Sequence, residues 1–280
     1  MTGETAAAPA ATTLRWVGHT EVGRVRKNNE DSFLCLQFDA RELHYLGKIG
    51  HVSLAQADCV FAVSDGMGGA AAGEFASRVA VEKITRLLPP AFKQSATGLS
   101  AGFSDVLTAV FEEIHRALMY LGTSYAECSG MGTTLSLCWL TPGWMYFGHI
   151  GDSRIYFLPA GGTGIRQLSH DDTYVGWLFR NGKINEREAR THPQRNALQR
   201  ALGAGNQFVE PQVGSVAYSV GDRFLLCTDG LIDGLRDDQL LQLASAADGQ
   251  TETAAFRMVR ASVEASGRDN TTALLIEARP

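Results

Sequence analysis

The order of the apolar segments constrains the fold of this chain more than any other feature of its sequence. Short runs rich in Val, Ile, Phe, Leu, Trp or Tyr predict β-strands at 14–18, 32–38, 58–64, 132–140, 144–150, 153–158, 213–219, 223–228 and 272–277. Apolar residues at helical spacing predict helices at 70–88, 102–121, 237–246 and 251–265. Strands therefore dominate both ends, while two long helices are consecutive in the middle. This order excludes a regular βαβ alternation and favours an α+β layered fold with two sheets.

The segment boundaries indicate a tail, one structural unit and an insertion. Residues 1–13 lack the basic start and the continuous apolar core of a secretory signal, so we expect a frayed tail. We expect the first long helix to end before Pro89 and Pro90, and the second at Gly122. Residues 169–205 are polar, helical in pattern and rich in Arg and Asn, which predicts a surface insertion between two strand-rich halves.

Composition excludes several classes of function. The net charge of -5 provides no basic field for nucleic acid, and no apolar run approaches the roughly 18 residues needed to span a bilayer. We therefore expect a soluble protein that binds neither nucleic acid nor membrane. The five cysteines show no C-x-x-C pairing, which favours buried free thiols in a reducing cytoplasm.

Aspartates at the ends of the predicted strands are the main candidates for chemistry. The runs FAVSDG (61–66) and FLLCTDG (224–230) each place an Asp directly before Gly, at Asp65 and Asp229. Glycine allows a sharp turn, so Asp65 and Gly66 are expected to offer a carboxylate and a carbonyl oxygen to one ion. Asp152 and Asp269 occupy similar Gly-flanked positions. One Asp-Gly pair alone is an ordinary turn, but the joint occurrence predicts an oxygen-only site for Mg²⁺ or Mn²⁺ rather than zinc or copper.

The segment GRVRKNNEDSF (23–33) adds a cation and two further acids at the start of a predicted strand. Arg26 is suited to bind a phosphate group through two N–H donors, while Glu30 and Asp31 are suited to hold metal-bound water. A solvated loop of mixed charge is the alternative interpretation.

In this order, the segments resemble the metal-dependent protein phosphatase family, type 2C, and its compact bacterial-type members in particular. The resemblance extends over residues 14–279 and is carried by GRVRKNNED (23–31), FAVSDGMGG (61–69), GMGTT (130–134), GHIGDSR (148–154), LSHDD (168–172), THPQRNALQRALG (191–203), LLCTDGL (225–231) and GRDNTT (267–272). It implies a four-layer α-β-β-α sandwich, with two antiparallel sheets flanked by helices. It also implies a catalytic domain over 14–280, with a helical flap at about 169–205.

The resemblance implies two core Mn²⁺ or Mg²⁺ ions. Asp65 would bridge both ions, and Asp229 and Asp269 would complete the first site. The Gly66 carbonyl, together with Glu30 acting through water, would serve the second site.

Further roles follow from the same resemblance. Asp31 would orient metal-bound water, and Arg26 would hold the substrate phosphate. Asp152 would bind a third, weaker ion together with Asp229. Met67 occupies the position where animal members carry a His, a candidate general acid, so the proton donor for the leaving group is left open.

The implied activity is hydrolysis of phosphoserine and phosphothreonine in proteins by direct attack of metal-activated water, without a phosphoenzyme. We expect a monomer that reverses a bacterial Ser/Thr kinase. One alternative is a phosphatase for anti-sigma antagonist phosphoproteins, and a more distant one is a phosphoprotein-binding module without catalysis. Cysteine catalysis of the tyrosine-phosphatase kind is disfavoured.

Overall fold

The computed structural model describes residues 13–55, 57–68, 72–96, 102–161, 164–246 and 252–280, and for residues 89–96 it describes the backbone alone. The tail expected at 1–13 lies outside the described residues, apart from Thr13, which begins the first strand. The first residues of the helix predicted at 251–265 and of the helix predicted at 70–88 also fall outside them.

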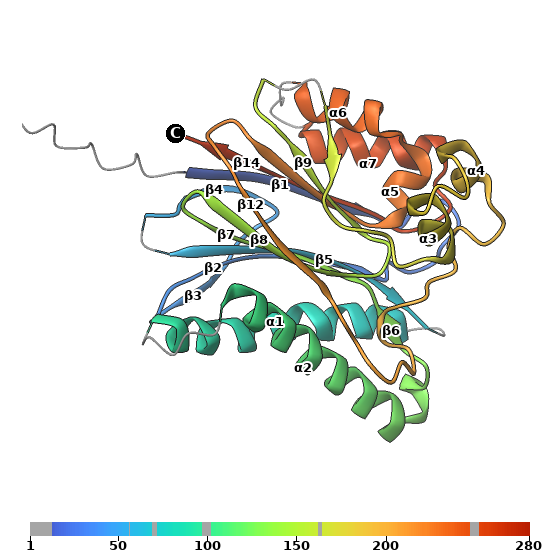
Figure 1. Cartoon of the computed structure of the whole chain (residues 1–280), viewed down its shortest axis with the longest axis horizontal. Coiled ribbons are helices and arrows are strands. Elements are labelled where there is room, and N and C mark those ends of the chain that lie inside the picture. The colour runs from blue at the N-terminus through green and yellow to red at the C-terminus, as the bar shows by residue number, and fades with distance from the viewer. Residues whose placement is uncertain (1–12, 56, 69–71, 97–101, 162–163, 247–251) are drawn as a thin grey trace, which may run out of the picture.

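Two antiparallel sheets form the centre of the molecule (Figure 1). The first sheet has the strand order β10 (Arg166–Gln167), β9 (Arg154–Leu158), β13 (Arg223–Cys227), β14 (Thr271–Arg279), β1 (Thr13–Glu21) and β4 (Ile49–Ser53). The second has the order β11 (Leu202–Gly203), β6 (Gly132–Thr133), β5 (Asp58–Met67), β7 (Leu135–Thr141), β8 (Trp144–Ile150) and β12 (Gln212–Ala217). In this second sheet β2 (Asp31–Phe38) pairs with β5 and with β3 (Leu43–Tyr45).

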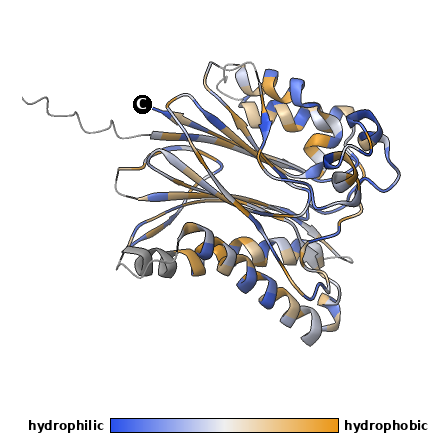
Figure 2. Ribbon diagram, viewed as in Figure 1, coloured by the Kyte–Doolittle hydropathy of each residue, from blue (hydrophilic) through white to orange (hydrophobic). Residues whose placement is uncertain are grey.

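Helices cover the outer face of each sheet. The helices α1 (Ala72–Ala96) and α2 (Phe103–Ser124) pack on the second sheet, and α5 (Asp229–Gly234), α6 (Asp237–Ser245) and α7 (Ala254–Ala265) pack on the first (Figure 1). The residues that these helices bury against the sheets are mostly apolar, such as Leu107 and Phe111 of α2 and Met258 and Val259 of α7. Figure 2 shows apolar and polar residues interleaved along the helices. The predicted four-layer α-β-β-α sandwich is therefore confirmed.

Three apolar layers hold the four layers of secondary structure together. The middle layer lies between the sheets and contains Trp16, Phe61, Phe224 and Ile276, all at most 3% exposed. The outer layers pack α1 and α2 against one sheet, and α5 to α7 against the other. Because the central strands are covered on both faces, they read as continuous apolar runs rather than as alternating patterns.

Several predicted boundaries are wrong for identifiable reasons. Helix α1 continues through Pro89 and Pro90 to Ala96; the fixed φ of proline lies near the helical value, although each proline removes a backbone N–H donor and crowds the preceding turn. Helix α2 likewise continues two residues past Gly122. Strand β5 runs to Met67 because its end pairs with β6, and the single strand expected at 132–140 divides at Thr134.

The sequence pattern did not predict the shortest strands and helices. Strands β3, β4, β10 and β11 and helix α5 span at most six residues each, too few to show a period. The insertion at 169–205 contains helices α3 (Tyr174–Arg180) and α4 (Glu186–Thr191), as its polar helical pattern suggested. We call this segment the flap.

Two further expectations concern the cysteines and the bilayer. All five cysteines are buried and free, as their apolar settings predicted. Across the described ranges, no helix combines the length and the apolar content that crossing a bilayer requires.

The layer between the sheets generates a prediction about stability. Phe61 is fully buried, with its ring 5.6 Å from that of Trp16, so Phe61→Ala should lower the free energy of unfolding by about 3–5 kcal/mol. Phe208 is 88% exposed, and Phe208→Ala should change it by less than about 0.5 kcal/mol. Urea unfolding of both variants measures the difference, and equal effects would show that this layer does not carry the fold.

Candidate metal centre and phosphate site

Strand ends from both sheets bring five aspartates to one end of the sandwich. Asp31 begins β2 and lies directly opposite Asp65 of β5 in the antiparallel register. Asp229 begins α5 immediately after β13, and Asp269 lies two residues before β14, the neighbour of β13. Asp152 lies in the turn between β8 and β9, which joins the two sheets. The sheets therefore contribute acids from both sides of one site.

Burial and mutual repulsion disfavour the charged forms of four of these carboxyl groups, those of Asp31, Asp65, Asp152 and Asp229. The pKa of Asp65 is raised well above its ordinary value, first by burial and then by the charges of Asp31, Asp229, Asp152 and Asp269. Burial, followed by the charges of Asp152 and Asp269, raises the pKa of Asp229 in the same way. Such a cluster is stable only when protons or cations offset the negative charge.

Asp31 and Asp152 show the same effect at a smaller scale. Burial raises the pKa of each carboxyl to about 7. In Asp31 two buried hydroxyls act against this rise, because Thr228 and Thr272 donate hydrogen bonds of 2.8 and 2.6 Å to Oδ2. The threonines thus hold one oxygen of Asp31 in place and leave the other free.

The unpaired oxygens fit a cation. Oδ1 of Asp31 and Oδ1 of Asp229 are buried and have no hydrogen-bond partner in the structure. A buried carboxylate oxygen without a donor is costly, and an oxygen-only donor set suits Mg²⁺ or Mn²⁺. Within the described ranges, no three acidic, histidine or cysteine side chains close around one point as a ready ligand set.

Gly66 and Gly230 matter for close packing, not for a turn. Neither has a left-handed φ, so the sharp turn expected after Asp65 is wrong. A Cβ at Gly66 would lie 2.0 Å from the carbonyl oxygen of Gly73 and 2.9 Å from that of Glu30. A Cβ at Gly230 would lie 2.0 Å from the carbonyl oxygen of Asn270. Both glycines allow the segments that carry the acids to touch.

Arg26 lies among the acids of the site. It donates a hydrogen bond of 2.7 Å to Asp269 and lies 3.9 Å from a Glu30 carboxylate oxygen. The hydrogen bond to Asp269 raises the pKa of Arg26, and burial raises the pKa of Glu30 against the opposing charge of Arg26. The Arg26 side chain is still about half exposed. It can therefore offer donors to an anionic ligand.

Asn270 is a structural residue of the site that the sequence analysis did not single out. Its side chain accepts a hydrogen bond from the Glu30 backbone N–H at 2.7 Å. It donates to the carbonyl oxygens of Val22 and Asn28, both at 2.9 Å. One amide that is 3% exposed thus binds the loop 22–30 at three points and positions Arg26 and Glu30. The GRDNTT motif contained this residue, but spacing alone did not reveal its role.

Buried hydroxyls explain the GMGTT motif, which had no assigned role. Thr134 Oγ1 accepts a hydrogen bond from the Asp65 backbone N–H at 3.0 Å and lies 2.7 Å from Ser153 Oγ. Thr133 Oγ1 donates to the Asp65 carbonyl at 2.7 Å. The strand that carries Asp65 and the turn that carries Asp152 are therefore joined by side-chain hydrogen bonds.

His149 supports the Asp152 turn from below. Its Nε2 lies 3.1 Å from the Gly151 carbonyl and must donate, so Nδ1 accepts from the Ser136 hydroxyl at 2.8 Å. Burial lowers the pKa of His149, consistent with this neutral form. The Gly151 N–H in turn donates to Asp172 at 3.1 Å, which joins the turn to the start of the flap.

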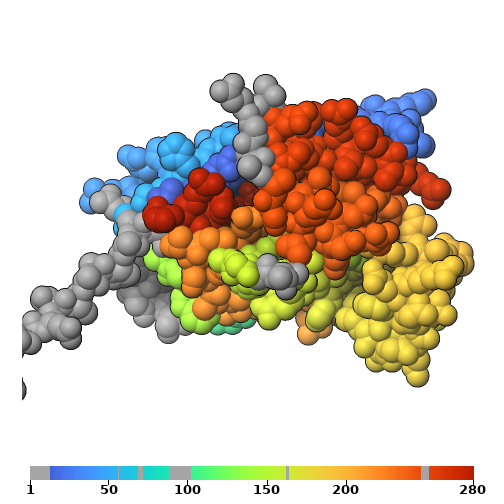
Figure 3. All heavy atoms as spheres, turned by 90° about the horizontal axis from the view of Figure 1, so that it is seen from above, coloured from blue at the N-terminus to red at the C-terminus, as the bar shows by residue number. Residues whose placement is uncertain are grey.

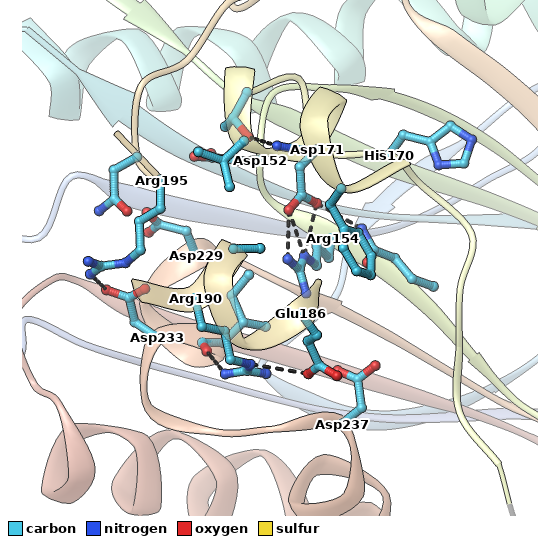
Figure 4. A pocket seen from close by; sticks show the side chains of 18 of the residues that line it. Asp152, Arg154, His170, Asp171, Glu186, Arg190, Arg195, Asp229, Asp233 and Asp237 are labelled. Atoms are coloured by element: carbon cyan, nitrogen blue, oxygen red, sulfur yellow. Dashed lines mark hydrogen bonds and ion pairs between the residues drawn. The ribbon is translucent and has the colours of Figure 1, made fainter. Parts of the chain in front are cut away.

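The flap contacts the helix that begins at Asp229. Arg195 of the flap pairs with Asp233 at 3.0 Å, and Arg190 donates to the carbonyls of Ile232 and Leu235 near the end of α5. The space-filling view shows the flap as a block beside the C-terminal helices, at the same end of the molecule as the loop 22–30 (Figure 3). A cavity of about 800 Å³ lies between flap and body, with Asp152 and Asp229 in its lining (Figure 4).

A cysteine mechanism is inconsistent with the structure. Cys35 and Arg41 do have the C-x5-R spacing of cysteine-dependent phosphatases. However, Cys35 lies within strand β2, is 4% exposed, and burial raises the pKa of its thiol. A thiol held in the neutral form is a poor nucleophile.

The carboxylate cluster generates a prediction about pH. The folded pKa of Asp31 lies above that of the unfolded chain, so its contribution to stability is present below about pH 4 and is lost as pH rises through about 7. Asp31→Asn should therefore stabilise the metal-free chain at pH 8 by on the order of 1–3 kcal/mol, and less as pH falls towards 5. Urea unfolding in EDTA at both pH values measures this. Asp238→Asn changes an exposed acid and should not stabilise the chain more at pH 8 than at pH 5. An equal effect in both variants would show that burial of the Asp31 carboxyl does not cause the pH dependence.

A second prediction concerns the loop held by Asn270. Asn270→Asp keeps the acceptor for the Glu30 N–H but places a carboxylate oxygen next to the carbonyl oxygens of Val22 and Asn28. This repulsion should lower the free energy of unfolding by about 1–3 kcal/mol. Amide hydrogen exchange in residues 22–30 should become faster. Asn181→Asp, at an exposed position of the flap, serves as the control. Unchanged exchange in the loop would show that Asn270 does not hold it.

Comparison with known proteins agrees with this geometry. Residues 47–270 match the family model of protein phosphatase 2C. The chain is 31% identical over 259 residues to the serine/threonine phosphatase stp of Listeria monocytogenes. This alignment covers 92% of this chain and 93% of that protein. It is also 31% identical over 269 residues to the serine/threonine protein phosphatase PstP of Mycobacterium tuberculosis, covering 94% of this chain and 45% of that longer protein.

Solved structures show the same fold. The crystal structure of the Mycobacterium tuberculosis phosphatase PstP superposes with a TM-score of 0.76 at 31% identity, over 96% of this chain and 100% of that chain. A catalytic domain of PstP in complex with two manganese ions superposes with a TM-score of 0.74 at 29% identity, over 96% of this chain and 100% of that chain. The chain therefore belongs to the protein phosphatase 2C family of serine/threonine phosphatases.

Proposed function

We propose that this protein removes phosphate from phosphoserine and phosphothreonine in other proteins, with two Mn²⁺ or Mg²⁺ ions and a weaker third ion. The observation that carries the proposal is a pair of buried oxygens, one on Asp31 and one on Asp229, in a cluster of repelling carboxyl groups; neither oxygen has a hydrogen-bond partner in the part of the chain that the structure describes. Such an arrangement is costly without cations, so its occurrence favours a metal site over a structural cluster. Residues 14–280 would form the catalytic domain.

The ligands would come from both sheets. Asp65, Asp229 and Asp269, with the Gly66 carbonyl and Glu30 through water, would hold the two core ions, and Asp152 would hold the third together with Asp229. When bound, the ions would lower the pKa of a water molecule and polarise the phosphoryl group. The manganese-bound PstP structure supports this assignment by similarity.

The side chains of the protein would supply the remaining steps. Arg26 would exchange its hydrogen bond to Asp269 for the phosphoryl oxygens, offering paired N–H donors as negative charge increases in the transition state. Asp31, held by Thr228 and Thr272, would orient the attacking water through its free Oδ1. Asn270 would keep Arg26 within reach by binding its loop.

The natural substrates would be phosphoproteins, including a cognate bacterial Ser/Thr kinase. The named relatives in Listeria and Mycobacterium support the substrate class by similarity. An action on anti-sigma antagonist phosphoproteins is the second candidate within the same chemistry.

A kinetic experiment tests the proposal. The protein should release phosphate from a phosphothreonine peptide with Mn²⁺ or Mg²⁺, and EDTA should abolish the release. Asp229→Asn removes a charged ligand and should lower kcat by at least about 100-fold. Asp238→Asn, an exposed acid on α6 that pairs with Arg236, should leave kcat unchanged.

The outcomes separate the alternatives. Turnover that persists after removal of all divalent ions would refute the proposed mechanism. Metal-dependent binding of the phosphopeptide without release of phosphate would favour a non-catalytic binding module. Turnover of a phosphorylated anti-sigma antagonist at a much higher kcat/KM than of kinase peptides would favour the second candidate.

A further inference from the structure

The cavity beneath the flap extends well beyond the proposed metal ligands. Its volume of about 800 Å³ is bounded by the flap on one side and by α5 and the end of α7 on the other (Figure 4). Asp152 and Asp229 line one end, so the cavity opens directly from the proposed catalytic centre. A volume of this size exceeds the need of one phosphoryl group and matches that of sites for much larger ligands.

Most charges in the cavity neutralise one another. Arg154 pairs with Asp171 at 2.6 Å, Arg195 with Asp233 at 3.0 Å, and Arg190 with Glu186 at 3.3 Å. These three pairs are satisfied within the protein, and Figure 4 shows them along the cavity wall. They shape the cavity without leaving a net charge.

Two further arginines of the lining are not neutralised. Among the residues that the structure describes, Arg180 donates to the backbone carbonyl of Asp171, at 2.7 Å, and forms no ion pair. Arg268 makes no hydrogen bond and no ion pair to any residue in the described ranges, although it lines the cavity. The one remaining acid away from the metal end, Asp237, already accepts a hydrogen bond from Tyr156. Away from Asp152 and Asp229 the lining therefore has five arginines against four acids, a net positive charge of one, in a protein whose net charge is -5; with Asp152 and Asp229 counted, five arginines face six acids.

Arg268 is held at the boundary between the cavity and the phosphate site. Arg24 donates from its backbone N–H to the Gly267 carbonyl at 2.7 Å and from its guanidinium to the Ser266 carbonyl at 2.9 Å. The next residue, Asp269, pairs with Arg26. The backbone on both sides of Arg268 is therefore anchored, while its side chain is exposed.

The cavity also presents apolar surface. Phe179 of the flap is 48% exposed and lines the cavity opposite Ile232 of α5. A peptide chain could therefore bury apolar atoms here while its charged side chains reach the arginines.

We propose that this cavity binds the substrate segment beside the phosphorylated residue, and that Arg268 and Arg180 bind an anionic side chain of that segment. A carboxylate and a second phosphoryl group share this chemistry. The inference rests on the proposed phosphatase activity and adds a preference for acidic sequences around the site of dephosphorylation.

A panel of phosphothreonine peptides tests the inference. In each peptide one position near the phosphothreonine carries Glu, Gln, Lys or a non-hydrolysable phosphonate analogue of phosphoserine. The varied position ranges from four residues before the phosphothreonine to four residues after it. At the best position, kcat/KM for the Glu peptide should exceed that for the Lys peptide by about fivefold or more at low salt. The phosphonate arm shows whether a second phosphoryl group is preferred over a carboxylate.

Charge reversal in the enzyme identifies which arginines bind the anionic side chain of the peptide. Arg268→Glu should invert the ratio of kcat/KM between the Glu and Lys peptides, and Arg180→Glu should reduce or invert it. A merely structural role would lower kcat/KM for both peptides without changing their ratio. Arg260→Glu is the matched control, because Arg260 is equally charged and exposed but lies on α7 among Glu252 and Glu264, and it should leave the ratio unchanged.

The results distinguish a failure of the proposed phosphatase activity from a failure of the proposed anionic subsite. If no peptide releases phosphate with Mn²⁺, the proposed function is refuted. If all peptides are hydrolysed with equal kcat/KM, or if the ratio is the same in the wild type, Arg268→Glu and Arg180→Glu, the phosphatase stands and the anionic subsite is refuted.

Discussion

The repulsion among buried carboxyl groups at one end of the sandwich is the constraint on which the rest of the structure depends. Asp31 and Asp65 are directly opposite on neighbouring strands, where like charges destabilise a sheet, and Asp229 approaches them from the other sheet. An ordinary protein of this size would not keep such an arrangement, because it costs stability. The large apolar layers between and outside the sheets offset that cost and hold the strand ends where the acids meet.

The neighbours of the acids have a separate task, which is to fix the geometry. Thr228 and Thr272 orient one carboxylate, and Asn270 holds the loop that carries Arg26. Thr134 and Ser153 join the two segments that bear Asp65 and Asp152. Since these polar groups are buried and satisfied, they restrict the site without adding charge. These hydrogen bonds hold the acids of the site in place, while Oδ1 of Asp31 and Oδ1 of Asp229 have no hydrogen-bond partner among the described residues.

The flap lies next to the acidic centre and is the candidate segment for contacts with the substrate. It is a polar segment anchored by arginines to the carbonyl and carboxylate groups of α5, the helix that starts at Asp229. Its side chains Asp171 and Arg195 pair with Arg154 and Asp233 of the body, whereas Arg180 donates to a backbone carbonyl and would keep its charge for a ligand. Catalysis and selectivity would then occupy adjoining parts of one cleft, the first built on strand ends and the second on a surface insertion.

Local signals were enough to predict the layered α+β class, most strands, both long helices and the candidate acids, because apolar periodicity and the short motifs that carry the aspartates are read within a few residues. Three features became visible in the folded molecule alone: Gly66 serves close packing, Asn270 binds a loop some 240 residues away in sequence, and α1 continues through two prolines. The tertiary structure also decided which arginines are paired in the flap cavity. These features depend on contacts between distant segments, and local spacing carries no information about which distant partner a side chain meets.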